Sequence, residues 1–382
     1  MKIAFMITSL QYGGAEKIVL DLIGRFRGLS IECWLIALYE SRDRVKRDQL
    51  AEALEREGIR LVELNKRPGE GTFRSMLRLK RVLRDISPDV VNAHGPVPNM
   101  YAGIANLWGR KVSTITTVHN GTDDWPDWKS KMLERTSLLG VNRVVCVAQH
   151  VAEAYRLKYP QSTAKTAIIE NGIDPQRYAP PSPAVRAQWR EMLGCPADAA
   201  LLIHVGRMVP LKNQRFLVEV AERLRSRGKK FRLLLVGNFE DDRYVEEIRQ
   251  LTEKHGLTEQ VRLLGSRDNV GDLLGASDVF LFPSEVEAFG LALLEAMCCG
   301  LPAVCSDIPS NRKLSELSAR NRVVDWDAER WAEQIELLLE DRPERRRQES
   351  YPYWTLERMA GDYLKLYGQS GSLLAGLGGG TG

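Results

Sequence analysis

The segment most informative about the fold is Phe282-Pro-Ser-Glu-Val-Glu-Ala-Phe-Gly-Leu-Ala-Leu-Leu-Glu-Ala-Met297. An apolar run ends at Phe282, a polar turn follows, and apolar residues with helical spacing begin at about Phe289. This succession predicts a buried strand, a loop and a helix, which is the repeating unit of parallel α/β sheets.

The same succession recurs on both sides of this segment. Short apolar runs alternate with longer segments of helical spacing, and a proline-rich stretch, 178–183, divides the runs into two sets. The runs are Ile3–Ile7, Cys33–Leu38, Val90–Asn92, Thr114–Val118 and Val144–Val147 in the first set, and Leu201–Val205, Phe231–Val236, Val261–Leu264, Val279–Phe282 and Ala303–Cys305 in the second.

We therefore predict an α/β protein with two doubly wound parallel-sheet domains, 1–177 and 178–354, that face each other across a cleft. In such sheets ligands bind outside the carboxyl ends of the strands. A helical pattern over 355–368 is predicted to join the first domain. The Gly- and Ser-rich tail, 369–382, is predicted to be disordered.

Charge is distributed unevenly over the 382 residues, whose net charge is +4. Residues 1–180 hold 27 basic and 20 acidic residues, whereas residues 181–382 hold 27 and 30. The basic half, with its amphipathic segment Phe73–Arg84, suggests an anionic partner such as a membrane surface, not a nucleic acid. An ordinary uneven surface and a helix that packs by its apolar face are the alternatives.

The six cysteines and five histidines show no zinc-ligand spacing, so we expect no metal site. Asp325-Trp-Asp327 resembles a metal-binding DxD motif, but Asp327 precedes a helical pattern and is expected to cap that helix. Unpaired cysteines favour a cytoplasmic protein. Met1–Ile7 is interpreted as a buried strand, not a signal peptide, and no apolar run reaches the length of about 18 residues that spans a membrane.

Two glutamates, Glu287 and Glu295, stand on either side of the predicted helix start. Helical spacing would separate them by about 12 Å, too far to hold one atom but suitable for the two ends of an extended ligand. The helix N-terminus between them offers unpaired N–H groups and a positive dipole end, which suit a diphosphate. A helix start stabilised by an acidic residue is the alternative.

Arg207 and Lys212 follow the apolar run Leu201–Val205 and a glycine. They are therefore expected at the carboxyl end of a buried strand, where a ligand would lie. Two fixed cations there can stabilise negative charge on a departing diphosphate, as a metal ion does elsewhere. Solvated loop cations are the alternative.

Gly14 and His119 are the candidates in the first half of the chain. Gly13-Gly14 directly follows the first predicted strand, where glycine lets backbone approach a ligand, although a tight turn explains it too. His119 ends the run Thr114–Val118 and precedes Asn120-Gly121, so it is expected to donate a hydrogen bond to a sugar in the cleft.

Together these segments resemble the GT-B-fold family 4 of retaining glycosyltransferases over nearly the whole chain. The specific match is the E-x7-E motif from Glu287 to Glu295. Weaker matches, in the family's order, are Gly13-Gly14-Ala15-Glu16, Val118-His119-Asn120, Glu170-Asn171-Gly172-Ile173-Asp174, and Val205-Gly206-Arg207 with Lys212-Asn213.

The resemblance implies a role for each matching side chain. Arg207 and Lys212 would bind the donor diphosphate, Glu287 the donor sugar and Glu295 the nucleotide ribose. His119 would lie near the 6-position of the sugar. By the same resemblance, no metal would be required.

The resemblance also implies backbone contacts. Gly14 would let the backbone approach the phosphate and sugar, and the turn that holds Arg267 would contact the base. The phosphates would meet the backbone of Ala288, Phe289, Gly290 and Leu291. Ala288 departs from the family, where glycine is frequent at this position.

The expected function is metal-independent, retaining transfer of a sugar from a nucleoside diphosphate sugar, such as a UDP-sugar, to a hydroxyl acceptor. A lipid-linked acceptor at the inner membrane face, in surface polysaccharide or glycolipid assembly, is the leading interpretation. A soluble natural-product or metabolite acceptor is the first alternative. Sugar-nucleotide epimerisation, which would need acid and base groups beside the sugar, is the second.

Overall fold

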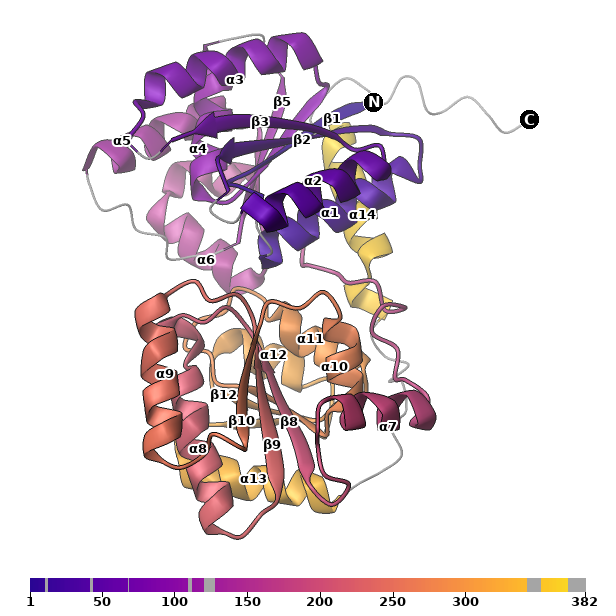
Figure 1. Cartoon of the computed structure of the whole chain (residues 1–382). Helices are drawn as coiled ribbons and strands as arrows, with labels where there is room; N and C mark the ends of the chain where they lie inside the picture. The colour runs from indigo at the N-terminus through magenta and orange to yellow at the C-terminus, as the bar shows by residue number, and fades with distance from the viewer. Residues whose placement is uncertain are drawn as a thin grey trace. The chain divides into compact units, whose positions relative to one another are not determined.

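The computed structural model describes residues 1–10, 13–41, 44–67, 69–108, 112–119, 128–341 and 352–369. The chain divides into two compact units (Figure 1). The first comprises Met1–Gly172 and the segment from Leu356 onward, and the second comprises Ile173–Thr355.

The first unit is built on a parallel sheet of seven strands in the order β3-β2-β1-β4-β5-β6-β7. The strands are β1 (Lys2–Ile7), β2 (Glu32–Tyr39), β3 (Arg60–Lys66), β4 (Val90–His94), β5 (Ser113–Val118), β6 (Arg143–Cys146) and β7 (Thr166–Ile168). The helices are α1 (Gly14–Arg27), α2 (Arg44–Arg56), α3 (Thr72–Ile86), α4 (Pro96–Leu107), α5 (Trp128–Ser137), α6 (Gln149–Lys158) and α14 (Leu356–Gln369).

Helices cover both faces of this sheet because successive strand residues point to opposite sides. Met6 of β1 belongs to a core that includes Leu79 of α3 and Tyr101 of α4. Its neighbour Phe5 points the other way and stacks on Phe26 of α1, with ring centroids 6.1 Å apart. The first unit is therefore doubly wound, as predicted.

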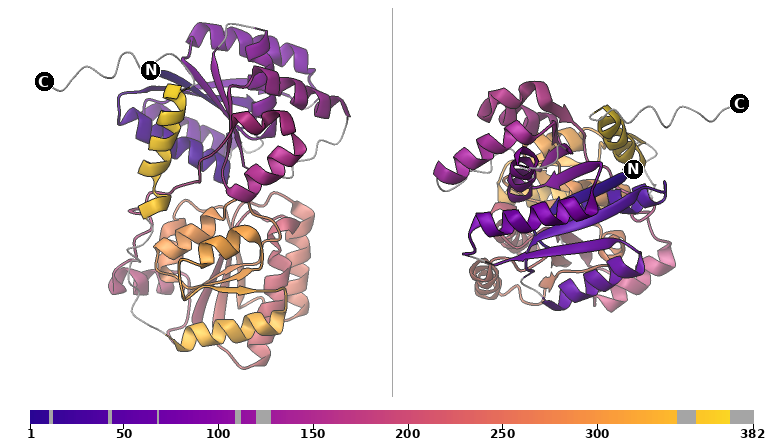
Figure 2. Two further views of the ribbon diagram at one scale, coloured as in Figure 1. Left: turned by 180° about the vertical axis from the view of Figure 1, so that it is seen from behind. Right: turned by 90° about the horizontal axis from the view of Figure 1, so that it is seen from above.

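The C-terminal helix α14 packs in the first unit although it follows the second in sequence (Figure 2). Asn92 of β4 donates to the Tyr367 hydroxyl at 2.6 Å, and Thr117 of β5 lies 3.3 Å from the Tyr363 hydroxyl. All four side chains are buried, so these bonds satisfy polar groups that would otherwise be costly in the core.

The second unit repeats the architecture with six parallel strands in the order β10-β9-β8-β11-β12-β13. They are β8 (Ala200–Val205), β9 (Phe231–Val236), β10 (Val261–Gly265), β11 (Val279–Phe282), β12 (Ala303–Ser306) and β13 (Arg322–Val324). The helices are α7 (Pro183–Met192), α8 (Gln214–Ser226), α9 (Asp242–Lys254), α10 (Val270–Ala276), α11 (Leu291–Cys298), α12 (Pro309–Ser315) and α13 (Ala328–Glu340).

The strand order reverses direction at one point in each sheet, between β1 and β4 and between β8 and β11. At such a switch point the loops that follow the two strands diverge to opposite faces and leave room for a ligand. A ligand site is therefore expected at the loops after β1, β4, β8 and β11.

The structure also differs from the sequence prediction in detail. β3, β7 and β13 were not predicted, and α11 begins at Leu291 and not at Phe289. The first unit ends at Gly172, a few residues before the predicted boundary at 177, and the 178–183 segment ends at Pro183, the first residue of α7. The cleft between the domains stays a prediction, and the predicted disordered tail lies outside the described residues except for Gln369.

Two further expectations concern the surroundings of the protein. All six cysteines are buried and unpaired. Among the helices in the described ranges, none combines the length and apolar character needed to cross a membrane.

Candidate functional site

The loops after β8 and β9 approach each other closely. Gly237 has a φ of 153°, and a Cβ on it would lie 1.9 Å from the Gly206 carbonyl oxygen. Only glycine fits there, so the pair fixes the start of the loop that carries Arg207. Gln214, the first residue of α8, donates from Nε2 to the Arg207 carbonyl at 2.8 Å and holds the loop from the other side.

His204 of β8 is part of this support and not of the site. Its Nδ1 lies 2.9 Å from the Leu281 carbonyl, which can only accept, so Nδ1 carries the proton and Nε2 accepts from Gln214 at 3.2 Å. Burial lowers the pKa of His204 to about 4, so the ring is neutral near pH 7. His204 is fully buried and belongs to the core.

Lys212 and Glu287 meet across the switch point of the second sheet. The Lys212 ammonium lies 2.5 Å from Glu287 Oε1, and the side chains are 16% and 12% exposed. The loops are also joined by their backbones, because Glu285 donates to the Leu211 carbonyl at 2.9 Å. An ammonium and a carboxylate are therefore held side by side where the fold predicts a ligand.

Arg207 forms a looser ion pair. Its Nη1 donates to both Glu240 oxygens, at 2.9 and 2.8 Å, and the side chains are 49% and 39% exposed. This partner was not predicted from the sequence. Glu240 lies in the loop after β9, the strand next to β8, and only the strand order brings that loop to Arg207.

The helix predicted after Glu287 is α11, and its N-cap residue is Gly290. Gly290 caps α11 with left-handed backbone angles of 87° and 46°, and a Cβ there would lie 3.2 Å from Leu314. Phe289 is buried and Ala288 and Leu291 are half-buried beside it. The N–H groups at the start of α11 have no carbonyl partner within the helix, so this end can bind an anion.

Glu295 lies inside α11 and is 6% exposed. The estimated separation of Glu287 and Glu295 assumed helical spacing for all the residues between them, and this assumption was wrong. Glu287 lies in an irregular loop, because α11 begins only at Leu291, after the left-handed Gly290, and does not include Phe289.

Arg267 lies on the exposed turn after β10, next to Gly265, which has a positive φ of 70°. β10 is the edge strand of the second sheet. The predicted contact of this turn with a nucleobase stays a prediction.

Gly14 of the first unit is the first residue of α1, and Gly13 is the N-cap with an extended backbone. The Lys17 N–H donates to the Gly13 carbonyl at 3.0 Å, which is the first hydrogen bond of the helix. This helix start follows β1 at the switch point of the first sheet, which is the equivalent of α8 following β8.

His94 and His119 follow β4 and β5 and contact each other. His94 Nδ1 lies 3.0 Å from His119 Nε2, so one nitrogen donates and the other accepts. Burial lowers the pKa of His119 to about 4 and that of His94 well below 6.5, and both rings are therefore neutral near pH 7. This contact was not predicted from the sequence, and Asn120 and Gly121 lie outside the described residues.

The structure thus brings together Lys212 and Glu287 and places Arg207, the start of α11 and Glu295 in the same unit. Gly14 and His119 belong to the first unit. Asp327 caps α13 by accepting from Glu329 and Arg330, which confirms the prediction for the DxD segment. Across the described ranges, the acidic, histidine and cysteine side chains form no group of three or more that could hold a metal ion.

Comparison with known proteins matches both halves of the chain. Residues 12–177 match the sequence model of Glycosyltransferase Family 4, and residues 185–353 match that of Glycosyl transferases group 1. The two matches follow one another along the chain and together leave only its ends and a short central segment unmatched.

Two curated relatives illustrate the similarity. The putative glycosyltransferase EpsF of Bacillus subtilis is 30% identical over 187 residues, which are 48% of this chain and 47% of EpsF. The UDP-Gal:alpha-D-GlcNAc-diphosphoundecaprenol alpha-1,3-galactosyltransferase of Escherichia coli is 27% identical over 252 residues, 63% of this chain and 64% of the relative. The matches therefore span less than two thirds of the length of either relative.

Solved structures share the fold over almost the whole chain. HepE of Anabaena, crystallised with UDP and glucose, has a TM-score of 0.78 at 20% identity and covers 97% of this chain and 100% of its own. A glycosyltransferase from Rickettsia africae has a TM-score of 0.79 at 20% identity, with 97% and 98% covered.

Proposed function

Because this chain belongs to the family 4 glycosyltransferases, we propose that it moves a sugar from a UDP-sugar to a hydroxyl group, with retention of configuration and without a metal ion. The observation that carries the proposal is the Lys212–Glu287 pair at the β8/β11 switch point, next to the start of α11. UDP is favoured as the nucleotide because HepE, which shares the fold, binds UDP and glucose.

The donor diphosphate is proposed to lie between the two cations and the start of α11. Lys212 keeps Glu287 as one partner and has two further N–H donors for a phosphate. Arg207 leaves Glu240 at small cost, because exposed pairs contribute only about 0–1 kcal/mol, and then binds the diphosphate bidentately. Glu287 and Glu295 accept hydrogen bonds from the sugar and ribose hydroxyls respectively.

The reaction breaks the bond between C1 of the sugar and the phosphate oxygen and forms a bond from C1 to the acceptor oxygen on the same face. The electron pair of the broken bond stays on the diphosphate, where Arg207 and Lys212 stabilise it. The acceptor proton passes to the departing phosphate oxygen. His119 donates a hydrogen bond to the sugar as a neutral ring.

Nuclear magnetic resonance of the product tests this proposal. The enzyme with EDTA and a panel of UDP-, GDP- and ADP-sugars, with membrane extract as the acceptor source, should give a glycoside with the donor's anomeric configuration, fastest with a UDP-sugar. An inverted product, or activity that EDTA abolishes and Mg²⁺ restores, would contradict it.

The acceptor is proposed to be lipid-linked, in polysaccharide or glycolipid assembly, because the Escherichia coli relative acts on a diphosphoundecaprenol substrate. The surface of α3 supports this. Phe73 and Leu77 are 64% and 50% exposed, and Lys80, Arg81 and Arg84 continue the same helical face. Apolar groups followed by cations suit an anionic membrane surface, so we place the enzyme as a peripheral protein at its cytoplasmic side.

Vesicle co-sedimentation distinguishes this acceptor class from a soluble one. The wild type should sediment with phosphatidylglycerol vesicles at low salt, and F73S/L77S should lose most of this binding. V185S/M192S is the matched control, since Val185 and Met192 are 40% and 67% exposed on α7 of the other unit. Equal binding by both variants, or none by the wild type, would favour a soluble acceptor.

A further inference from the structure

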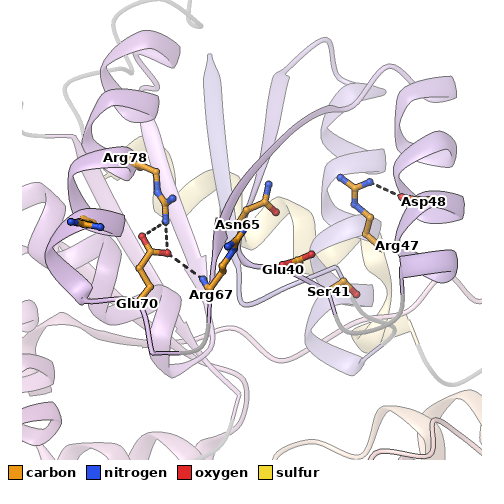
Figure 3. Close-up of a pocket in the computed structure, with 9 residues that line it drawn as sticks. Glu40, Ser41, Arg47, Asp48, Asn65, Arg67, Glu70 and Arg78 are labelled. Atoms are coloured by element: carbon orange, nitrogen blue, oxygen red, sulfur yellow. Dashed lines mark hydrogen bonds and ion pairs between the residues drawn. The ribbon is translucent and has the colours of Figure 1, made fainter.

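The first unit holds a pocket of about 750 Å³ at the carboxyl ends of β2 and β3 (Figure 3). Glu40 and Ser41 follow β2. Asn65 is the penultimate residue of β3, and Arg67 directly follows that strand. The beginnings of α2 and α3 form its two sides. The lining residues are Glu40, Ser41, Arg47, Asp48, Asn65, Arg67, Glu70, Arg74 and Arg78.

Two of the four arginines in this pocket are already neutralised. Arg47 donates to Glu63 and, at 2.6 Å, to Asp48. Arg78 donates from one nitrogen to both oxygens of Glu70, at 2.6 and 2.8 Å. These pairs fix the two sides of the pocket and leave little charge on them for a ligand.

The other two arginines, Arg67 and Arg74, form no ion pair with the described residues. Among the described residues no carboxylate lies within ion-pair distance of Arg67 or Arg74, and both side chains are exposed. Glu70 accepts from the Arg67 backbone N–H at 3.2 Å, so the loop that presents Arg67 is anchored to Arg78 (Figure 3). The pocket thus presents two guanidinium groups from two different elements, and guanidinium groups bind phosphate oxygens bidentately.

The pocket lies in the same unit as two features described above, the exposed face of α3 that holds Phe73 and Leu77, and His119 after β5. Phe73 and Leu77 begin the face of α3 that is proposed to contact the membrane, called here the membrane-facing stripe. Arg74 and Arg78 lie about 100° around the helix from these two residues, so the pocket opens beside the stripe. In the sheet, β1 and β4 separate β2 from β5, the strand that His119 follows. At about 4.8 Å per strand, the ends of β2 and β5 are about 14 Å apart, so the pocket lies on the same edge of the sheet as His119 but is separate from it.

We propose that this pocket binds a phosphate group of the acceptor through Arg67 and Arg74, and so selects a phosphorylated acceptor for the transferase. That the ligand is the acceptor rests on the function proposed above; that the pocket binds phosphate rests on its own residues. A lipid-linked phosphate and a soluble sugar phosphate share this chemistry. The membrane-facing stripe next to the pocket favours the lipid-linked one.

Calorimetric titration of pyrophosphate into the full chain tests the pocket. Saturating UDP is present so that the donor site is filled. The wild type should bind pyrophosphate, and R67Q/R74Q should bind it at least tenfold more weakly. R25Q/R27Q is the matched control, because it removes two exposed arginines from the end of α1 and should bind like the wild type.

Wild-type affinity in R67Q/R74Q, or no pyrophosphate binding by the wild type, would overturn the pocket proposal. Equal melting temperatures of the two variants verify that both are folded. UDP binding, measured in the first step, separates the proposals: if UDP binds and pyrophosphate does not, only the pocket is refuted. If UDP fails to bind, the donor site is refuted.

Vesicles distinguish the two sources of phosphate. Phosphatidic acid carries a terminal phosphate, whereas phosphatidylserine vesicles can be matched in total charge without one. A preference of the wild type for phosphatidic acid that R67Q/R74Q lacks supports a lipid phosphate. Loss of pyrophosphate binding in the variant without any such preference supports the phosphate site with a soluble acceptor.

Discussion

Lys212 and Glu287 are held in a largely buried ion pair, whereas Arg207 and Glu240 form an exposed one. Removal of one member of a buried pair leaves the other charge without a partner and without water. The same change in an exposed pair costs little folding free energy, because water solvates the charge that is left. Two cations with the same proposed ligand therefore differ in what they contribute to folding.

This difference gives a prediction for two alanine variants. Lys212→Ala should lower the free energy of unfolding by about 3 kcal/mol, whereas Arg207→Ala should lower it by less than about 1 kcal/mol. Both should weaken UDP binding. Urea denaturation beside calorimetry measures both quantities, and equal losses of stability would show that the Lys212–Glu287 pair is not buried as described.

Glu240 competes with the donor for Arg207 in the proposed mechanism. Glu240→Gln should therefore strengthen UDP binding by about threefold, the value of an exposed ion pair. Glu247→Gln, which releases Arg215 from a similar exposed pair on α8 and α9, is the control and should leave UDP affinity unchanged. Weaker binding by Glu240→Gln would mean that Glu240 itself orients Arg207 toward the donor.

The neutral histidines make stability depend on pH. Burial lowers the folded-state pKa of His119 to about 4, whereas the unfolded chain takes up the proton near 6.5. The unfolded state therefore binds more protons between these values, so this contribution is fully present above pH 6.5 and is lost as pH falls toward 4.

Urea unfolding at several pH values measures the effect. His119→Gln should reduce the slope of unfolding free energy against pH by up to about 1.4 kcal/mol per pH unit between 6.5 and 4. His255→Gln, at the end of α9 and away from the sheets, should retain the wild-type slope. Identical slopes in all three proteins would contradict the buried neutral state.

Secondary structure was predictable where strands are central and much less so at the edges of the sheets. The runs at β1 and β11 are continuous and apolar, and that at β8 is interrupted only by His204, because both faces of a central parallel strand are buried. The unpredicted strands β3, β7 and β13 are all edge strands, with polar or half-exposed residues, and the last two have only three residues each. No local apolar pattern marks them.

Side-chain partners were predictable only where sequence neighbours decide them. Asp327 caps the helix that directly follows it, and this was predicted. The Arg207–Glu240 pair and the His94–His119 contact depend on which strands are adjacent in the sheet. Strand order is set by packing over the entire domain, so it leaves no signal in the short segments that hold these residues.

The start of α11 provides a prediction at the level of a helix. Gly290→Ala should destabilise the protein by about 1–2 kcal/mol, because a side chain disfavours left-handed angles and its Cβ would crowd Leu314. Gly361→Ala in α14 is the control: its Cβ meets nothing within 4 Å, so alanine should stabilise that helix by about 1 kcal/mol. Thermal denaturation measures both, and a stabilised Gly290→Ala would contradict the cap geometry.

The two units share one strand order and differ in the chemistry at their switch points. The second presents cations, carboxylates and a helix start, which suit an anionic donor. The first presents a glycine-started helix and two neutral histidines, and holds the arginine pocket at the ends of β2 and β3. This division agrees with the proposal that the donor binds the second unit and the acceptor the first, and each half of the proposal can be tested without the other.

Lys212 at the β8/β11 switch point is proposed to stabilise a departing UDP without a metal ion. The most direct measurement is the rate of UDP release from a saturating UDP-sugar in EDTA, for the wild type and for Lys212→Ala. Turnover by the wild type with a loss of about 10²-fold in the variant is predicted. Turnover that requires Mg²⁺, or a variant as fast as the wild type, would contradict the claim.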